Sequence, residues 1–285
     1  MLDVPIVDTH LHLWDPKHLR YPWLDEVPPL NKPFLLDDYR QACGPLEVAR
    51  MVFVQCEVAF SQYREEVAWV THLAGRDARI RGLVPWAPLE QGEAARPALA
   101  ALARNPLVKG IRRIIQFEPE PDFCLQPGFV RGVQLLAEFD LHFEICLKGD
   151  DQFRNTLALV RPCPDVRFIL DHIGKPFIKE GILEPWKGLL KELSTLPNTW
   201  CKVSGLVNEA DVGHWTPDDL KPYLDWVFTC FGWDRVMYGG DWPVATLAAT
   251  YPRWVETLAG AVAEARVQEQ RQLFHDNAVA FYRLA

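Results

Sequence analysis

Two histidines close to the N-terminus, His10 and His12, follow the apolar run Val4-Pro5-Ile6-Val7. The run predicts a short buried strand, and side chains two residues apart on a strand point to the same side. Two imidazoles placed in this way could bind one metal ion or one substrate oxygen from the same direction. A working site would need further polar groups at the ends of other strands.

Two later apolar runs end in residues that could complete such a site. Phe168-Ile169-Leu170 leads into His172, and Val236-Met237-Tyr238 leads into Asp241. A lone histidine at a strand end is more often a structural hydrogen-bonding group than a ligand. The combination is more specific, because three separate strand ends carry it. His10, His12, His172 and Asp241 are therefore the candidate catalytic residues, and the candidate ligands of one Zn²⁺ ion.

The rest of the chain must supply elements that bring these strand ends together. Apolar runs alternate with amphipathic stretches along the whole sequence. Helices are predicted over Ala94–Arg104, Gly128–Phe139 and Asp218–Phe231. The strands predicted by the apolar runs are near Ile6–His10, Arg50–Glu57, Ile80–Trp86, Val108–Gln116, His142–Leu147, Val166–His172, Trp200–Gly205 and Arg235–Asp241.

Eight such repeats in 285 residues favour a single domain, residues 1–285, folded as a parallel (β/α)8 TIM barrel. The alternative is a doubly wound open sheet, which would want a glycine-rich turn after the first strand. The first turn here carries His-x-His instead. In a barrel the carboxyl ends of all strands meet at one mouth, which is where active sites lie.

The stretch from Trp14 to Phe34 is rich in proline and cannot form a regular helix. It follows the first predicted strand, so in a barrel it would lie over the mouth. We expect it to form a lid or a wall of the pocket, with an ordered surface loop as the alternative.

Composition limits the partners of the protein. With 38 acidic and 30 basic side chains, the formal net charge is -8, which argues against nucleic acid as a partner. No segment approaches the roughly 18 apolar residues that span a membrane, and the N-terminal run is too short for a signal peptide. Seven scattered cysteines predict buried, reduced thiols in a cytoplasmic protein. A homo-oligomer is left open.

Sequence motifs in order along nearly the whole chain resemble the amidohydrolase superfamily, in the amidohydrolase-2 branch that contains sugar lactonases. The motifs are V-D-T-H-L-H-L-W-D-P at the start, G-L-V-P-W-A-P-L-E at 82–90, K-G-I-R-R-I-I-Q at 109–116, L-D-H-I-G-K-P at 170–176, K-V-S-G-L at 202–206, Y-G-G-D-W-P-V at 238–244 and D-N-A-V-A-F-Y-R-L near the end. The resemblance implies a distorted (β/α)8 barrel of the metal-dependent hydrolase type. It also implies a hydrolase that opens a sugar-acid lactone, such as fuconolactone or rhamnonolactone.

The chain departs from the metal-binding members of this superfamily at two strands. Many of them add a Lys or Glu at the fourth strand and a His at the end of the fifth. Here the fourth strand offers Arg112 and Arg113, and the fifth ends in Ile145-Cys146-Leu147-Lys148. A two-metal centre is therefore not expected. One Zn²⁺ held by the four candidate ligands, or a reaction without metal, both stay open.

Lactone hydrolysis assigns roles to the candidate residues. Asp241 is the expected general base, which takes a proton from the attacking water and returns it to the ring oxygen. The three histidines would polarise the carbonyl, directly or through zinc. The expected substrate-binding residues are Arg113, preferred over Arg112 as the cation facing the pocket, Gln55 for hydroxyl groups, and Trp14, Trp86 and Trp242 for the apolar faces of the sugar.

Two other functions compete with lactone hydrolysis. A zinc-dependent non-oxidative decarboxylase of the same branch would use the same His-x-His pair, His172 and Asp241 to hold its metal. A non-catalytic barrel that binds sugar acids would be expected to lack one of these residues, and none is missing.

Overall fold

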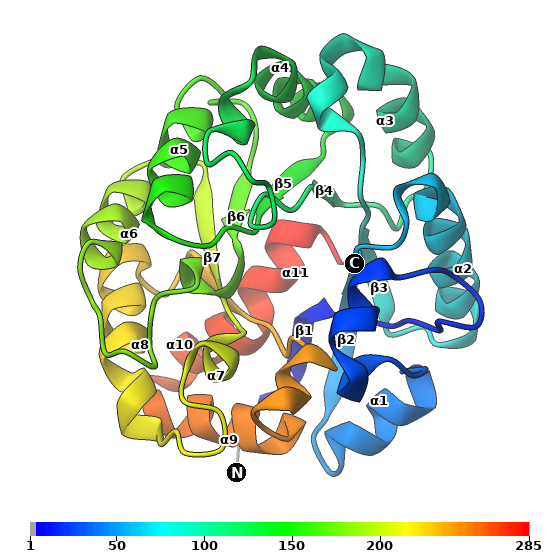
Figure 1. Ribbon diagram of the computed structural model, residues 1–285. Coiled ribbons are helices and arrows are strands. Elements are labelled where there is room, and N and C mark those ends of the chain that lie inside the picture. The colour runs from blue at the N-terminus through cyan, green and yellow to red at the C-terminus, as the bar shows by residue number, and fades with distance from the viewer. Residues whose placement is uncertain (1–3, 285) are drawn as a thin grey trace.

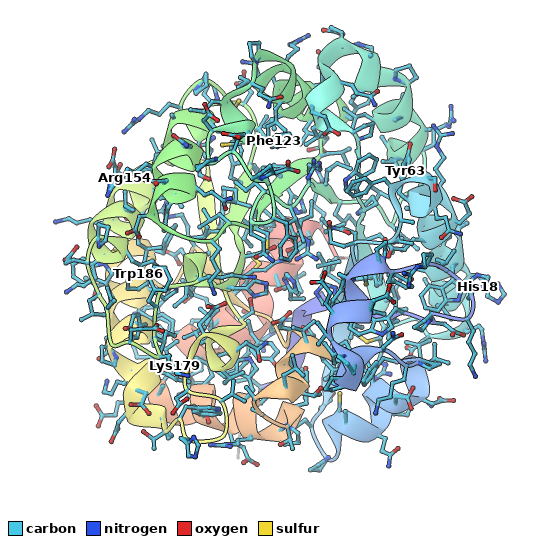
Figure 2. All side chains as sticks on the ribbon, viewed as in Figure 1. His18, Tyr63, Phe123, Arg154, Lys179 and Trp186 are labelled. Carbon is cyan, nitrogen blue, oxygen red and sulfur yellow. The ribbon has the colours of Figure 1, made fainter. Side chains whose placement is uncertain are left out.

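A computed structural model describes residues 4–284 and shows parallel strands at the centre with helices around them (Figure 1). All eight predicted strands are present, most of them shorter than expected. Their bounds are β1 Ile6–Leu11, β2 Val48–Val54, β3 Ile80–Val84, β4 Gly110–Arg112, β5 His142–Ile145, β6 Phe168–Leu170, β7 Thr199–Val203 and β8 Val236–Tyr238. Figure 2 shows that side chains fill the space between these strands and the surrounding helices.

Each strand pairs in parallel with its neighbours in the sequence, in two sheets ordered β1-β2-β3 and β4-β5-β6-β7-β8. Single bridges connect the sheets, Leu83 with Val108 on one side and Leu11 with Trp242 on the other. The ring of strands is therefore a distorted barrel that continuous ladders do not close. The sequential order excludes the doubly wound open sheet, in which the strand order reverses at a switch point.

Helices alternate with the strands as the sequence predicts. Their bounds are α1 Leu36–Cys43, α2 Tyr63–Arg76, α3 Arg96–Ala103, α4 Pro127–Leu135, α5 Asp150–Val160, α6 Trp186–Ser194, α7 Leu206–Glu209, α8 Pro217–Phe231, α9 Tyr251–Ala261, α10 Val267–Arg271 and α11 Asn277–Tyr282. The long helix α8 begins with a capping box, in which the Thr216 backbone N–H donates to Asp219 Oδ2 at 2.7 Å. Its apolar face is buried against the barrel.

The last helix, α11, lies behind the centre of the strand ring (Figure 1). Phe281 and Tyr282 on this helix belong to a buried cluster with Val7, Val52 and Ile169 from the strands. Both aromatic rings also contact His142 at the start of β5. The helix therefore fills the barrel near the amino ends of the strands and leaves the carboxyl ends free for a site.

The proline-rich stretch after β1 forms two short 3-10 turns, Pro22–Glu26 and Pro28–Leu30. Trp14 and Phe34 pair across its base, and Trp14 Nε1 donates to the carbonyl oxygens of Leu30 (3.2 Å) and Lys32 (3.0 Å). Trp14 and Trp23 line the cavity at the mouth of the barrel, so the stretch forms a wall of this cavity.

The structure also describes the helix lengths and the state of the cysteines. Within residues 4–284, no helix is both long and apolar enough to cross a membrane. All seven cysteines carry free thiols, and six of them are buried.

Candidate active site

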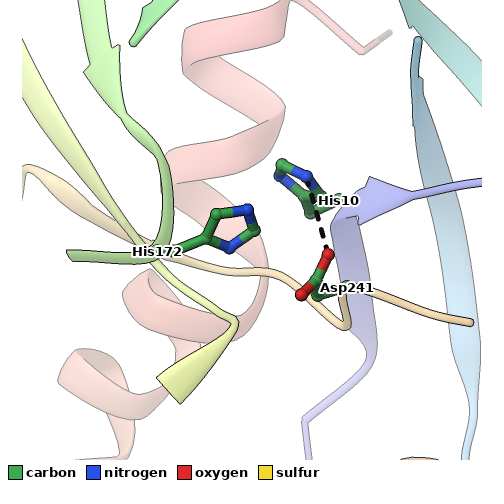
Figure 3. A group of neighbouring side chains, drawn as sticks. All are labelled: His10, His172 and Asp241. Atoms are coloured by element: carbon green, nitrogen blue, oxygen red, sulfur yellow. Dashed lines mark ion pairs between the residues drawn. The ribbon is translucent and has the colours of Figure 1, made fainter. Parts of the chain in front are cut away.

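The structure brings the four candidate catalytic residues together at the carboxyl ends of the strands, and Figure 3 shows three of them, His10, His172 and Asp241. His10 Nε2 lies 3.8 Å and His12 Nε2 lies 3.6 Å from the same oxygen, Oδ1 of Asp241. The ring centroids of His10 and His172 are 4.4 Å apart. All four side chains are buried, so one small substrate atom could contact several of them at once.

Asp8 holds the first and last strands in place beneath this cluster. Its Oδ1 accepts hydrogen bonds from the backbone N–H groups of His10 (3.0 Å) and Gly240 (2.8 Å). Its Oδ2 accepts from the hydroxyls of Tyr39 (2.7 Å) and Tyr251 (3.0 Å). No sequence motif points to this role of Asp8, although an acidic residue inside an apolar strand indicates that it is buried and partnered.

Backbone hydrogen bonds complete the connection between β1 and the segment after β8. The Asp241 N–H donates to the carbonyl oxygen of His10 at 2.8 Å, and the His12 N–H donates to that of Trp242 at 2.8 Å. The catalytic histidines and Asp241 are thus held by main-chain contacts as well as by Asp8.

Two of the four residues have backbone conformations that L-amino acids rarely adopt. His172 and Asp241 both have a φ of 53°. Left-handed conformations cost about 1–2 kcal/mol per residue and cluster at functional sites. Gly205 is required beside them, because it has a φ of 68° and a Cβ there would come within 2.5 Å of His172 Nδ1.

Hydrogen bonds restrict the protonation of the histidine rings. His12 Nδ1 lies 2.8 Å from the carbonyl oxygen of Val54, so Nδ1 carries a proton and donates it. In the neutral ring, Nε2 is then an acceptor that faces Asp241. His172 Nδ1 lies 3.0 Å from Ser204 Oγ, which leaves its Nε2 free for a ligand.

The arginine that faces the cavity is Arg112, not Arg113, which reverses the placement expected from the sequence. Strand β4 ends at Arg112, which is paired in register with the inward-facing Glu144 of β5. Arg113 therefore points outward. It forms ion pairs with Glu118 (2.6 Å) and Glu90 (3.3 Å), so its role is structural.

Two buried cations flank the His10 ring. Arg112 Nη1 lies 3.0 Å from His10 Nε2, and Lys202 Nζ lies 3.2 Å from His10 Nδ1. Burial, followed by the charges of Lys202 and Arg112, lowers the pKa of His10 well below its usual value. Burial and the neighbouring His10 likewise lower the pKa of His172. Both rings are therefore neutral at neutral pH.

The two cations are balanced by two carboxylates inside the barrel. Lys202 Nζ lies 2.5 Å from Glu144 Oε2 and 3.2 Å from Asp171 Oδ1. Burial alone would raise the pKa of Asp171, but Lys202 and Arg112 outweigh it and hold this pKa below its usual value. Tyr282 of α11 donates to Glu144 Oε1 at 2.7 Å, so the last helix is connected to the network under the site.

A cavity of about 300 Å³ opens above the cluster, and Arg112, His12, His172 and Asp241 lie on its lining. This volume is at the lower end of the range for small-molecule pockets. Of the residues expected to bind substrate, Trp14 lies on this lining.

The remaining expected contacts lie elsewhere. Gln55 is fully buried, and its Nε2 donates to Glu57 Oε1 at 2.6 Å. Trp86 stacks on Phe60 with the ring centroids 5.0 Å apart. Trp242 packs edge to face against Phe34 and Tyr39, with centroid separations of 5.5 and 5.2 Å. Trp86 and Trp242 are therefore packing residues rather than part of the cavity lining.

Asn208 is a site residue that the sequence did not reveal. It lies on the single-turn helix α7 and lines the cavity. Its Nδ2 is 3.5 Å from Asp241 Oδ2, while its buried Oδ1 has no hydrogen-bond partner among the described residues. A buried acceptor without a partner is costly, so this oxygen is suited to accept from a ligand or water. A lone Asn in the segment after β7 gives no pattern to search for.

Comparison with known proteins shows the family to which the chain belongs. The family model described as Amidohydrolase matches residues 7–284. The chain belongs to the amidohydrolase family. This amidohydrolase is 32% identical to an L-fucono-1,5-lactonase from Burkholderia multivorans, over 98% of the chain and 96% of that protein. It is 26% identical to an L-rhamnono-gamma-lactonase from Scheffersomyces stipitis, over 98% of both.

A solved structure of an amidohydrolase from Burkholderia multivorans with bound zinc superimposes with a TM-score of 0.87. It is 28% identical to this chain and covers 99% of it, and the chain covers all of that structure. The agreement over full length supports the distorted barrel.

The donor types in this amidohydrolase suit one zinc ion. Ligand atoms of His10, His172 and Asp241 lie within 4.8 Å of one another, and histidines with a carboxylate are a common ligand set for catalytic zinc. The contact of His12 with Val54 and that of His172 with Ser204 fix the ring orientations, as outer partners do in metal sites. His10 is less suited, because Arg112 already contacts its Nε2.

Proposed function

We propose that this amidohydrolase hydrolyses a sugar-acid lactone, an aldonolactone such as fuconolactone or rhamnonolactone, with Asp241 as the general base. The observation that carries the proposal is the pair formed by Asp241 Oδ1 and His12 Nε2, 3.6 Å apart at the floor of the cavity. Asp241 Oδ1 is a hydrogen-bond acceptor, and so is Nε2 of a neutral His12 ring that donates through Nδ1 to Val54. The names of the lactonase relatives support the same reaction class.

Two acceptors this close together can be bridged by a molecule that donates a hydrogen bond to each of them. A water molecule held there would donate one hydrogen bond to Asp241 and one to His12, with its lone pairs left for attack. As the oxygen bonds to the lactone carbonyl carbon, Asp241 takes the proton. Asn208 beside Oδ2 keeps the other oxygen of Asp241 directed at this water.

The carbonyl oxygen gains negative charge as the water attacks. Arg112 and His172 both line the cavity and would stabilise this oxygen. The guanidinium is a permanent cation, and it donates through Nη2 to the Gln55 carbonyl oxygen at 2.6 Å, which fixes its position. Gln55 would thus act through Arg112.

The ring bond then breaks between the carbonyl carbon and the ring oxygen. Asp241 returns its proton to the leaving alkoxide, so that the products are a hydroxyl group and a carboxylic acid. A lactone is an activated ester, and the site needs no further reactant than water.

A zinc ion, where bound, would be held by His10, His172 and Asp241, with Arg112 withdrawn from His10 Nε2, and His12 Nε2 near Asp241 could be a further donor. Such an ion would polarise the carbonyl and lower the pKa of bound water. The protein's own residues supply a base and a cation for the same two tasks.

The test is hydrolysis of a set of aldonolactones followed with a pH indicator, with and without prior dialysis against a chelator. We expect acid release from at least one lactone, with most of the rate retained after dialysis. Lack of acid release from every 1,4- and 1,5-aldonolactone would overturn the proposal. Loss of carbon dioxide from an aromatic acid that requires added metal would instead favour the decarboxylase.

A further inference from the structure

Three large apolar side chains stand exposed around the mouth of the cavity. Phe117, Val212 and Leu247 line it and keep 68%, 49% and 38% of their surface exposed. They lie in the segments that follow β4, β7 and β8, so three separate segments each contribute an apolar side chain to the mouth. Among the described residues, six large apolar side chains are this exposed, and half of them surround this mouth. Such clustering typically marks a ligand-binding surface.

Three charged groups on the cavity walls already have partners within the protein, whereas the Asn208 Oδ1 atom, on the residue that contacts Asp241 at the floor, has none among the described residues. Glu209 Oε2 pairs with Lys148 Nζ at 2.6 Å. Lys175 Nζ donates to Gln116 Oε1.

The carboxylate of Glu57 makes an equally local contact, because it accepts from Gln55 Nε2 at 2.6 Å. A substrate hydroxyl at the mouth would compete with these contacts for the same groups.

The cavity therefore has a polar floor and an apolar mouth. Val212 and Leu247 line the same cavity as Asp241 and His12, so a lactone whose carbonyl carbon lies at the floor could place its ring substituent against them. An apolar substituent would remove its own surface and theirs from water. The side chains of Val212 and Leu247 offer a hydroxymethyl group in the same place no hydrogen-bond partner.

We propose that Phe117, Val212 and Leu247 form an apolar subsite that selects lactones with an alkyl or aryl substituent on the ring carbon that bears the ring oxygen. The subsite rests on the proposed lactone hydrolysis, since it places the carbonyl at the catalytic floor. Fucono-1,5-lactone carries a methyl group at this carbon, and the subsite assigns to this amidohydrolase a preference for larger apolar groups there.

The experiment uses lactones with the same ring and hydroxyl stereochemistry that carry hydroxymethyl, methyl, propyl or phenyl at this carbon. We expect kcat/KM to rise from hydroxymethyl to propyl, by about two- to four-fold for each added methylene. The Leu247→Ser and Val212→Ser variants should lose most of this rise and keep the rate with the hydroxymethyl lactone. Both side chains are exposed, so the variants should fold normally.

The matched control is Val267→Ser, a change of the same type on α10 at a side chain that is 74% exposed and lies outside the cavity lining. It should leave the whole series unchanged. Equal kcat/KM across the series, preference for hydroxymethyl, or an equal effect of Val267→Ser would overturn the subsite while lactone hydrolysis stands. If no lactone in the series is hydrolysed, the proposed function fails and the subsite falls with it.

Discussion

The guanidinium of Arg112 lies 3.0 Å, Nη1 to Nε2, from the imidazole of His10. A histidine of the His-x-His pair thus has a permanent cation against the nitrogen that would bind a metal. The opposite nitrogen faces Lys202, 3.2 Å away. The floor of the site already contains fixed positive charge, which is the contribution that a metal ion makes in other hydrolases.

Removal of this guanidinium should make zinc bind more tightly. In Arg112→Met, the Nε2 lone pair of His10 becomes available and a positive charge beside the ion is lost, so affinity should rise by about ten-fold or more. Competition with a metal-binding dye measures the affinity. Unchanged affinity would mean that Arg112 does not compete for His10.

Arg112 and Arg113 should differ sharply in their effect on catalysis. Arg112→Lys keeps the charge but loses the planar group that contacts His10 and the Gln55 carbonyl, so kcat/KM for the lactone should fall by about 10²-fold. Arg113→Lys is the matched control, because Arg113 pairs with Glu118 and Glu90 away from the floor. A larger loss from Arg113→Lys would restore the placement that the sequence suggested.

Replacement of the general base should separate activity from folding. Asp241→Asn keeps the shape of the side chain but cannot take a proton, so kcat should fall by about 10²–10⁴-fold while the melting temperature stays close to that of the parent. Asp225→Asn, an exposed carboxylate on α8 that pairs with Lys221, is the control and should have no effect on kcat. Parent-like kcat in Asp241→Asn would exclude Asp241 as the base.

Asp8 should be essential for stability, although it touches no substrate. Asp8→Ala leaves the N–H groups of His10 and Gly240 and the hydroxyls of Tyr39 and Tyr251 without their acceptor. We expect a loss of about 2–4 kcal/mol in the free energy of unfolding, measured with denaturant.

A variant that removes only one of the donors to Asp8 serves as the comparison for Asp8→Ala. Tyr39→Phe removes one of the four hydrogen bonds to Asp8 and should cost only about 1 kcal/mol. If the two variants were equally stable, Asp8 would not be the element that joins the first and last strands.

Glu66 should make stability depend on pH. It is fully buried, accepts from the Cys56 N–H at 3.2 Å, and burial raises its pKa from 4.5 to about 8. The folded state therefore favours the protonated form. The contribution of Glu66 is fully present below about pH 4.5, declines as the pH rises, and is lost above about pH 8.

The variant Glu66→Gln tests this dependence, because glutamine is similar in shape but cannot ionise. Relative to the parent, Glu66→Gln should gain a few kcal/mol in the free energy of unfolding between about pH 5 and pH 8.5, at about 1.4 kcal/mol per pH unit. Denaturant titrations across this range measure the difference. A constant difference at all pH values would show that Glu66 does not titrate in this interval.

The order of the elements and the four residues at the strand ends could be predicted from the sequence. Strand and helix patterns depend on local periodicity, and a barrel places the ends of all its strands at one mouth. His10, His12, His172 and Asp241 could therefore be brought together without knowing any distance.

The residues that surround these four could be identified only from the three-dimensional structure. Arg112 rather than Arg113 faces the cavity because β4 stops at Arg112, and a shift of one residue turns a side chain to the other face. Asp8 and Asn208 gained their roles from partners far away in the chain. Trp86 and Trp242 became packing residues because neighbouring aromatic rings cover them. Contacts between distant segments have no local signature in the sequence. The four residues at the floor of the cavity could therefore be predicted, but the residues that hold them in place could not.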